Sequence, residues 1–109
     1  MKELQEILAA AEEARARGEA TALATIVGVR GSTYRRAGAR LLTTATGRQV
    51  GNISGGCLEG DVAVVAEEVL ASGVPRLVTY DLTADDDMVW GLGLGCNGAI
   101  EVFVEPTAP

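Results

Sequence analysis

Two cysteines, each set among glycines, are the residues of this 109-residue sequence with the clearest potential for chemistry. Cys57 directly follows Gly55 and Gly56, and Cys96 follows the segment 91–95, in which glycine alternates with leucine. The sequence contains no histidine, so the most common acid–base residue and metal ligand is missing. Chemistry in this chain therefore depends on thiols, backbone N–H groups, arginines and carboxylates.

The segment around Cys57 is predicted to be a junction between a strand and a helix. A helix N-terminus exposes unpaired N–H groups and a partial positive charge, and preceding glycines let an anion approach the backbone. A thiolate at such a position is stabilised, which lowers its pKa and raises its reactivity. Three roles stay open for Cys57: an anchor for a ligand, a sulfur nucleophile, or a small buried residue beneath a tight turn.

Several common sites are disfavoured by the same segments. No Gly-Lys-Ser/Thr sequence follows Gly56, as a Walker loop would require, and residues 51–60 lack the G-x-G-x-x-G spacing of a dinucleotide site. The segment after Cys96 is predicted to be a strand and not a helix, which also argues against a Rossmann site. Two cysteines without histidine cannot complete a tetrahedral zinc site. A soft metal or a metal-bound cofactor remains compatible with ligation by Cys57 and Cys96.

A polar loop from Gly31 to Arg40 is the second candidate region, because it contains Ser32, Arg35 and Arg36. Guanidinium groups match the oxygens of phosphate or carboxylate bidentately. The net charge of the chain is −6, which argues against a general nucleic-acid binder and favours a small anionic ligand at a local basic patch. An exposed loop with solvated arginines is the alternative interpretation.

These candidate regions are expected to lie on one small α/β domain that spans residues 1–109, with a mixed sheet of about five strands and two main helices packed on it. Hydrophobic residues make up 48% of the sequence, enough for an aliphatic core. The hydrophobic spacing predicts helices at residues 2–17 and 58–71, and strands at residues 22–30, 40–44, 49–53, 76–80 and 99–105. A hairpin is predicted at residues 44–48, because Gly47 supplies a turn residue between two strands.

The N-terminal residues 1–18 are charged throughout and do not look like a signal peptide. No run of about 18 apolar residues exists, so no membrane partner is expected. We therefore expect a cytoplasmic protein. Thiols stay reduced in the cytoplasm, so a transient disulfide between Cys57 and Cys96 is compatible with this location but a structural one is not expected.

Three motifs in order resemble the XdhC/CoxI family, and together they extend the resemblance from about Ala24 to Pro106. The motifs are Gly31-Ser32-Thr33-x-Arg35-x-x-Gly38-Ala39, then Gly51-x-Ile53-Ser54-Gly55-Gly56-Cys57-Leu58-Glu59, then Trp90-Gly91-x-Gly93-x-Gly95-Cys96-x-Gly98-x-Ile100-Glu101-Val102. Members of this family are maturation factors for molybdenum hydroxylases such as xanthine dehydrogenase and carbon monoxide dehydrogenase.

The resemblance implies a chaperone, more plausibly non-catalytic than an enzyme, that binds the molybdenum cofactor (molybdopterin) transiently. It would assist the exchange of an oxo ligand for a sulfido ligand and the insertion of the cofactor into the hydroxylase apo-enzyme. The implied partners are that apo-enzyme and a cysteine desulfurase that supplies sulfur. Larger relatives carry a second, Rossmann-like domain, so a separate Rossmann-domain partner and a homo-oligomer that completes the site are also expected.

Under this interpretation Cys57 contacts the molybdenum centre or carries sulfur, and Cys96 is the second metal ligand. Gly55 and Gly56 supply backbone donors to the cofactor, while Arg35 is the charge partner of its phosphate. Ser32 adds a hydroxyl group to the cofactor-binding set.

Two other classes of function remain open. One is a thiol-based sulfurtransferase or redox protein, which needs the two cysteine Cα atoms within about 7 Å of each other. The other is a docking module for a hydroxylase subunit, in which the cysteines are incidental. The chaperone interpretation requires that both thiols open into one recess lined by amides.

Overall fold

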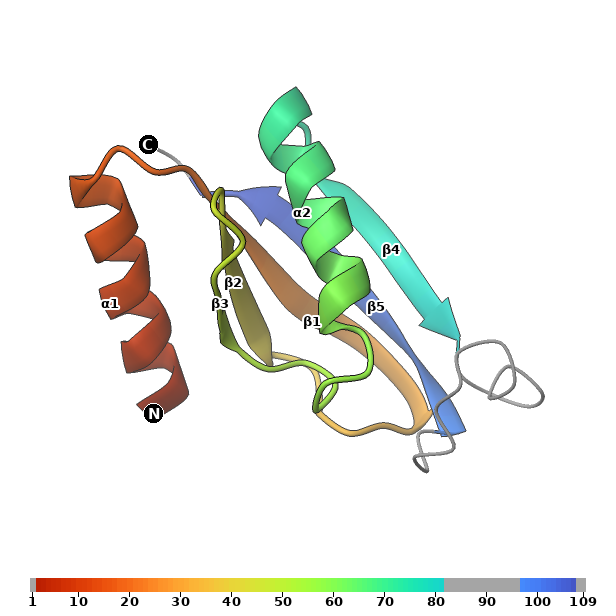
Figure 1. Cartoon of the computed structure of the whole chain (residues 1–109). Coiled ribbons are helices and arrows are strands. Elements are labelled where there is room, and N and C mark those ends of the chain that lie inside the picture. Colours follow the sequence, from red (N-terminus) through yellow and green to blue (C-terminus); the bar gives the residue numbers. More distant parts are fainter. Residues whose placement is uncertain (1, 82–96, 108–109) are drawn as a thin grey trace.

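The computed structural model, which describes residues 2–81 and 97–107, contains two helices and five strands in those residues (Figure 1). In chain order they are α1 (Lys2–Ala16), β1 (Thr21–Ser32), β2 (Arg40–Thr44), β3 (Gln49–Gly51), α2 (Glu59–Ser72), β4 (Arg76–Asp81) and β5 (Asn97–Pro106). The α/β class, both helices and all five strands agree with the prediction from the sequence. Their ends differ from the predicted ends by two residues or fewer.

The five strands form one sheet in the order β3-β2-β1-β5-β4. All four described pairings are antiparallel, so the sheet is not the mixed one expected from the sequence. The reason lies in the connection through α2, which leaves β3 at one edge and enters β4 at the opposite edge. These two strands run in the same direction but have three strands between them, and they never become neighbours.

The predicted hairpin between β2 and β3 is confirmed. Leu41 pairs with Gly51 and Thr43 with Gln49, and the turn closes with Gly47 at a φ of 94°. A backbone with this φ favours glycine because other residues meet a steric penalty there. The glycine at position 47, which predicted the hairpin, is therefore required by the conformation of the turn.

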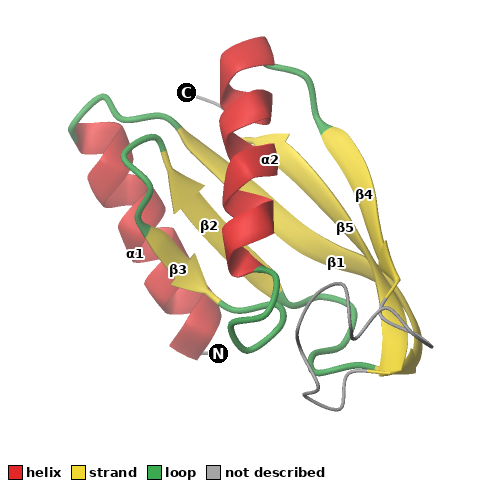
Figure 2. Ribbon diagram, turned by 45° about the vertical axis from the view of Figure 1, so that its right-hand side comes forward, coloured by secondary structure: helices red, strands yellow, loops and turns green. Residues whose placement is uncertain are grey.

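Helix α2 covers one face of the sheet and forms the main core with it (Figure 2). Successive residues of a strand point to opposite faces, so alternate positions of β5 and β1 reach this helix. The buried sheet residues of this core are Ala22, Ala24, Ile26, Leu41, Tyr80, Ile100, Val102 and Val104, and those from α2 and the residue before it are Leu58, Val62, Val65, Ala66 and Val69. Gly73 ends the helix in a left-handed conformation, and its amide donates to the carbonyl of Val69 at 2.7 Å.

Helix α1 packs on the other face, at the edge formed by β2 and β3. Leu41 belongs to the core beneath α2, whereas its neighbour Leu42 packs with Ile7 and Ala10 of α1. Since adjacent strand residues face opposite ways, the two helices lie on opposite sides of β2. Figure 2 shows the same arrangement, with α2 in front of the sheet and α1 behind β3.

Two connections meet at the lower end of the molecule in Figure 1, one between β1 and β2 and the other between β3 and α2. The first holds residues 33–39 and the second residues 52–58. They carry the arginines and the Gly-Gly-Cys sequence that the sequence analysis selected, so this end contains the candidate site. Among the described residues, neither helix is long and apolar enough to span a membrane.

Candidate functional site

The connection into α2 is held by hydrogen bonds to the carboxylate of Glu59, the first residue of that helix. Its Oε2 atom accepts hydrogen bonds from the amides of Ile53 at 2.9 Å and Ser54 at 3.0 Å. Its Oε1 atom accepts from the amide of Gly56 at 2.9 Å and from the hydroxyl of Ser54. The Ser54 hydroxyl also accepts a hydrogen bond from the amide of Leu58 at 2.8 Å. Glu59 and Ser54 together therefore bind four backbone amides of the segment that leads into the helix.

Glu59 remains a charged carboxylate in this position. Burial by itself raises the pKa of Glu59, but the hydrogen bonds from the Ser54 hydroxyl and from the amides of Ile53 and Ser54 outweigh it, so the pKa lies below its usual value. The chain thus places its own anion where the partial positive charge of a helix start favours one.

The two glycines predicted as backbone donors already have acceptors inside the chain. The amide of Gly55 donates to Oδ1 of Asn52 at 2.7 Å, and the amide of Gly56 donates to Glu59. A cofactor phosphate bound by these same amides would have to displace the Asn52 amide group or the Glu59 carboxylate. The role of Gly55 and Gly56 as donors to the cofactor stays a prediction, and it requires that one of these side chains be displaced.

Cys57 is half-buried and packs against the main core beside the fully buried Leu58. It forms no disulfide with another described residue. Cys96 lies outside the described residues. The distance between its thiol and that of Cys57, and the recess that both thiols were expected to share, therefore stay predictions. Strand β5 begins at the following residue, Asn97, which pairs with Ser32 at the end of β1.

Arg35 is bound within the chain by two partners. Its Nη1 and Nη2 atoms donate to the two carboxylate oxygens of Glu3, both at 2.9 Å, and Nη1 also donates to the carbonyl oxygen of Asn52 at 2.7 Å. The hydrogen bonds from Arg35 lower the pKa of Glu3, and the carboxylate raises the pKa of Arg35 in turn. Arg35 therefore connects α1 with both connections at this end of the molecule.

The ring of Tyr34 brings the arginine loop against the Gly-Gly-Cys segment. A Cβ atom added to Gly55 would lie 2.8 Å from the Tyr34 ring, and Gly55 has a φ of 76°. Both features favour glycine at this position. The two candidate regions are thus in direct contact, although Tyr34 and Gly55 lie 21 residues apart in the sequence. Ser32 lies nearby and lines a small crevice with Ser54 and Gly98.

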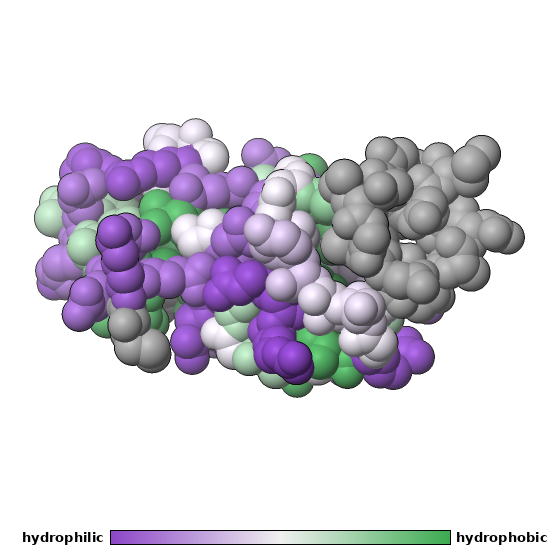
Figure 3. Space-filling view, turned by 90° about the horizontal axis from the view of Figure 1, so that it is seen from below, coloured by the Kyte–Doolittle hydropathy of each residue, from purple (hydrophilic) through white to green (hydrophobic). Residues whose placement is uncertain are grey.

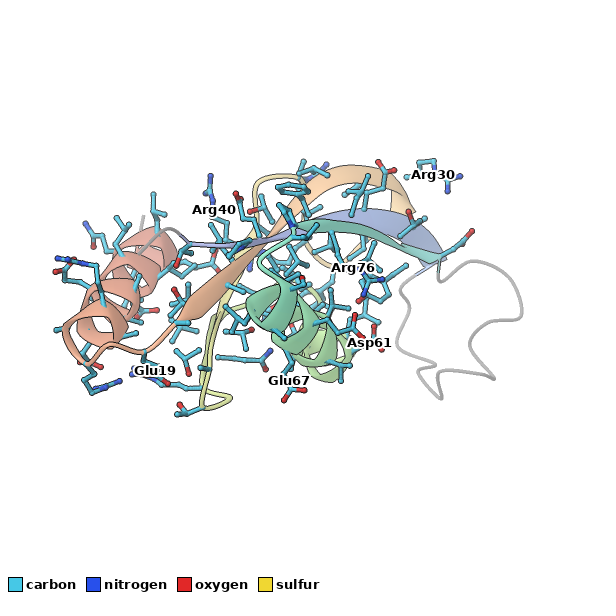
Figure 4. The ribbon with its side chains drawn as sticks, turned by 90° about the horizontal axis from the view of Figure 1, so that it is seen from above. Glu19, Arg30, Arg40, Asp61, Glu67 and Arg76 are labelled. Carbon is cyan, nitrogen blue, oxygen red and sulfur yellow. The ribbon has the colours of Figure 1, made fainter. Side chains whose placement is uncertain are left out.

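A cavity of about 480 Å³ lies between α1 and residues 34–40, next to this contact. Its lining residues are Glu3, Leu4, Ile7, Tyr34, Arg35, Arg36, Ala37, Gly38, Ala39 and Arg40. Figure 3 views the molecule from this end and shows hydrophilic surface on the side of α1 and over the connections, with hydrophobic atoms visible between them. In Figure 4, Arg40 points to the side of the sheet away from α2. The cavity is therefore separate from the core beneath α2.

The sequence pointed to Arg35, Cys57 and the two glycines. It did not show that Glu3, Asn52 and Glu59 bind the arginine and the glycines. Glu59 had a visible signal, because a carboxylate in the first turn of a helix favours capping. Glu3 and Asn52 gave no local signal, since their contacts with Arg35 join segments that are distant in the sequence. Among the described residues, no group of three or more cysteine, aspartate or glutamate side chains is arranged to hold a metal ion.

Comparison with known proteins adds a family to this geometry. The model of the XdhC and CoxI family matches residues 14–81, which include the arginine loop and the Gly-Gly-Cys segment. One relative, described as a probable subunit of xanthine dehydrogenase from Bacillus subtilis (strain 168), is 46% identical over 87 residues, which cover 80% of this chain and 26% of that protein. The molybdenum cofactor insertion chaperone PaoD from Escherichia coli (strain K12) is 35% identical over 94 residues, covering 86% of this chain and 29% of PaoD.

A solved structure shares the fold. The crystal structure of a xanthine dehydrogenase from Bacillus halodurans superposes with a TM-score of 0.79 at 43% sequence identity, over 94% of this chain and 31% of that one. The chain spans less than a third of the length of each of these three proteins.

Proposed function

This chain belongs to the XdhC and CoxI family, and we propose on that premise that it binds the molybdenum cofactor and takes part in inserting it into a molybdenum hydroxylase. One relative, PaoD, is itself described as a molybdenum cofactor insertion chaperone, and it matches 86% of this chain. A hydroxylase of the xanthine dehydrogenase or carbon monoxide dehydrogenase type is the expected recipient.

The observation that carries this proposal is the contact between two family motifs at one end of the fold. The arginine loop meets the Gly-Gly-Cys segment through Tyr34 and Gly55, and Arg35 is hydrogen-bonded to Asn52 of the same segment. A half-buried thiol, Cys57, stands within this segment. The arrangement supports the binding of a compact ligand that combines a soft metal centre with an anionic group, as the cofactor does.

In this proposal Cys57 contacts the molybdenum centre or carries sulfur, and Cys96 provides a second thiol. Gly55, Gly56 and Ser32 lie beside the bound cofactor. The role of Arg35 is modified, because it forms an ion pair with Glu3. It positions the two loops, and it is a weaker partner for a phosphate than an arginine without an ion pair.

The chain would also hold the cofactor during sulfuration. Replacement of an oxo ligand by a sulfido ligand releases water when sulfur arrives at the oxidation level of sulfide. A cysteine desulfurase that delivers persulfide sulfur would therefore need a thiol reductant as well. We expect the hydroxylase apo-enzyme and the desulfurase as cytoplasmic partners, and a second copy or a Rossmann-domain protein to complete the site.

Cofactor binding is the direct test. The purified chain is mixed with molybdenum cofactor under anaerobic conditions, and the molybdenum that co-elutes with it is measured, followed by activation of an apo-hydroxylase. Wild type is expected to retain the cofactor, and Cys57→Ser to lose most of it while its circular dichroism spectrum stays unchanged. Cys96→Ser and the double variant separate the contributions of the two thiols.

Two results would count against the proposal. No retention by the wild-type chain, alone or with its hydroxylase, contradicts cofactor handling itself. Equal retention and equal activation by Cys57→Ser contradict the role of this thiol but leave the family function in place.

A further inference from the structure

Arg36 and Arg40 differ from most other arginines of the described chain, because neither has a carboxylate partner there. Arg40 donates one hydrogen bond to the carbonyl oxygen of Gly38 at 3.3 Å, and Arg36 has an exposed side chain. Five arginines do form ion pairs with described carboxylates, namely Arg15, Arg17, Arg35, Arg48 and Arg76. Arg30 is a third arginine without one, but it lies at a different place.

Both arginines line the cavity of about 480 Å³ between α1 and the arginine loop. Three arginines line this cavity in all, and Glu3 is the acidic residue in its lining. Glu3 is bound on both oxygens by Arg35, and the charge of Arg40 also helps to lower the pKa of Glu3. The cavity therefore keeps a positive surplus on a chain whose net charge is −6.

The rest of the lining is apolar or aromatic. Leu4 and Ile7 come from α1, Ala39 directly precedes β2, and the exposed ring of Tyr34 lies at the side that contacts Gly55. A volume of 480 Å³ lies within the range of small-molecule sites, which is about 300–1,000 Å³. The chemistry of this lining fits a ligand with a flat, weakly polar ring and one anionic group.

We propose that this cavity binds the phosphate monoester of a planar heterocycle, with Arg36 and Arg40 on the phosphate and Tyr34 beside the ring. Arginine suits this role because its planar fork binds two phosphate oxygens at once. The site is distinct from the amides of the Gly-Gly-Cys segment, which Asn52 and Glu59 already occupy. Two molecules carry such a phosphate monoester, the pterin of the molybdenum cofactor and a nucleotide. The choice of the pterin as the natural ligand rests on the proposed function.

The test uses probes that need no molybdenum. Isothermal titration of the purified chain is carried out with guanosine monophosphate, guanosine, inorganic phosphate and, in a separate arm, molybdenum cofactor. The variants are Arg36→Ala, Arg40→Ala and the double variant. Arg30→Ala is the matched control, because it removes an arginine that also lacks a described carboxylate partner but lies outside the cavity; Figure 4 shows Arg30 far from Arg40 along the sheet.

The monophosphate is expected to bind wild type more tightly than guanosine or inorganic phosphate does. Each single variant should weaken this binding about tenfold and the double variant more, because a hydrogen bond to a charged group contributes about as much as a tenfold change in affinity. Arg30→Ala should bind like wild type, and added salt should weaken binding to wild type more than to the double variant. Circular dichroism and the melting temperature verify that each variant is folded.

Failure of this inference can be told apart from failure of the proposed function. If the double variant binds guanosine monophosphate and the cofactor as tightly as wild type, or if wild type binds neither phosphate compound, the cavity is not the site. If the double variant loses the monophosphate and wild type fails to bind the cofactor, the inference holds with a nucleotide as ligand and the cofactor proposal is wrong.

Discussion

The amide of Gly56 donates a hydrogen bond to Oε1 of Glu59 at 2.9 Å, so the first residue of α2 binds back to the segment that leads into the helix. Glycines before a helix are commonly associated with binding of an external anion. Here an internal carboxylate takes that place. The arginine-lined cavity is therefore a better candidate for an anion site than the amides of Gly55 and Gly56. Glu59 in turn has a structural role that can be measured.

Glu59→Ala is expected to lower the free energy of unfolding by about 2 kcal/mol, because several backbone donors lose a charged acceptor. The folded-state pKa of Glu59 lies below its usual value of 4.5, so its stabilising contribution is complete above pH 4.5 and is lost as the pH falls through the lower folded value. Urea denaturation from pH 7 down to pH 3 checks this. The gap between wild type and variant should narrow on acidification.

Glu67→Ala is the matched control, since Glu67 is an exposed carboxylate on the same helix (Figure 4). It should change stability by less than about 0.5 kcal/mol. A gap between wild type and Glu59→Ala that stays constant down to pH 3 would contradict the assigned role of the carboxylate.

Gly55→Ala and Gly18→Ala form a second test, because both glycines have nearly the same positive φ, 76° and 71°. An added Cβ atom meets nothing within 4 Å at Gly18, but it lies 2.8 Å from the Tyr34 ring at Gly55. We expect a loss of about 1 kcal/mol for Gly18→Ala from the backbone conformation alone. Gly55→Ala should lose about 1 kcal/mol more through the clash with the ring. Thermal denaturation of both variants measures the difference, and Tyr34→Ala should remove the excess. Equal losses in the Tyr34→Ala background and in wild type would show that the two loops are not in contact.

Gly98→Ala should be much more harmful than Gly28→Ala, although both glycines lie on paired strands. A Cβ atom at Gly98 would lie 2.3 Å from the carbonyl oxygen of Arg30, which belongs to the backbone and cannot move aside. At Gly28 the nearest atom is the carboxylate oxygen of Glu101, at 2.6 Å, and this flexible end of a side chain can turn away. We expect about 3 kcal/mol or failure to fold for Gly98→Ala, and about 1 kcal/mol or less for Gly28→Ala. Expression levels and denaturation midpoints of the two variants measure this difference. Similar losses of stability in both variants would contradict the pairing of β1 with β5.

The Glu3–Arg35 pair should show a measurable coupling energy in a double-mutant cycle of Glu3→Ala and Arg35→Ala. Its two side chains are 35% and 31% exposed and joined by two hydrogen bonds, so we expect a coupling of about 1 kcal/mol. The exposed pair Glu12–Arg15 on the same helix is the control, with an expected coupling of about 0.3 kcal/mol. High salt should weaken the control more strongly. Equal couplings would mean that Arg35 does not hold α1 in place.

The positions of the strands could be predicted from the sequence because their signal is local. In β5, Ile100, Val102 and Val104 alternate with Glu101 and Phe103, and the structure buries the first set and leaves the second partly or fully exposed. The pattern of one strand is enough to show which side faces the core. The same local reasoning found Gly47 as a turn residue.

Apart from the β2–β3 hairpin, the pairing of the strands could not be predicted in the same way, and neither could the contacts of the candidate site. Whether two strands run antiparallel depends on where α2 carries the chain, and no local pattern encodes that. Arg35 is bound by Glu3, which lies 32 residues earlier, and no local pattern of the sequence shows that its charge has this partner. For the same reason Arg36 and Arg40, which were secondary to Arg35 in the sequence, are the more suitable anion partners.

The position of β5 has a consequence for how the chain reaches its folded state. This strand follows the other four described strands in the sequence, yet it lies between β1 and β4, and Ala22 near the start of β1 pairs with Pro106 at the end of β5. Such distant pairings are slow to form because a long loop must close first. During synthesis on the ribosome, β1 and β4 would each keep an unpaired edge until β5 emerges, and exposed strand edges of this kind favour aggregation.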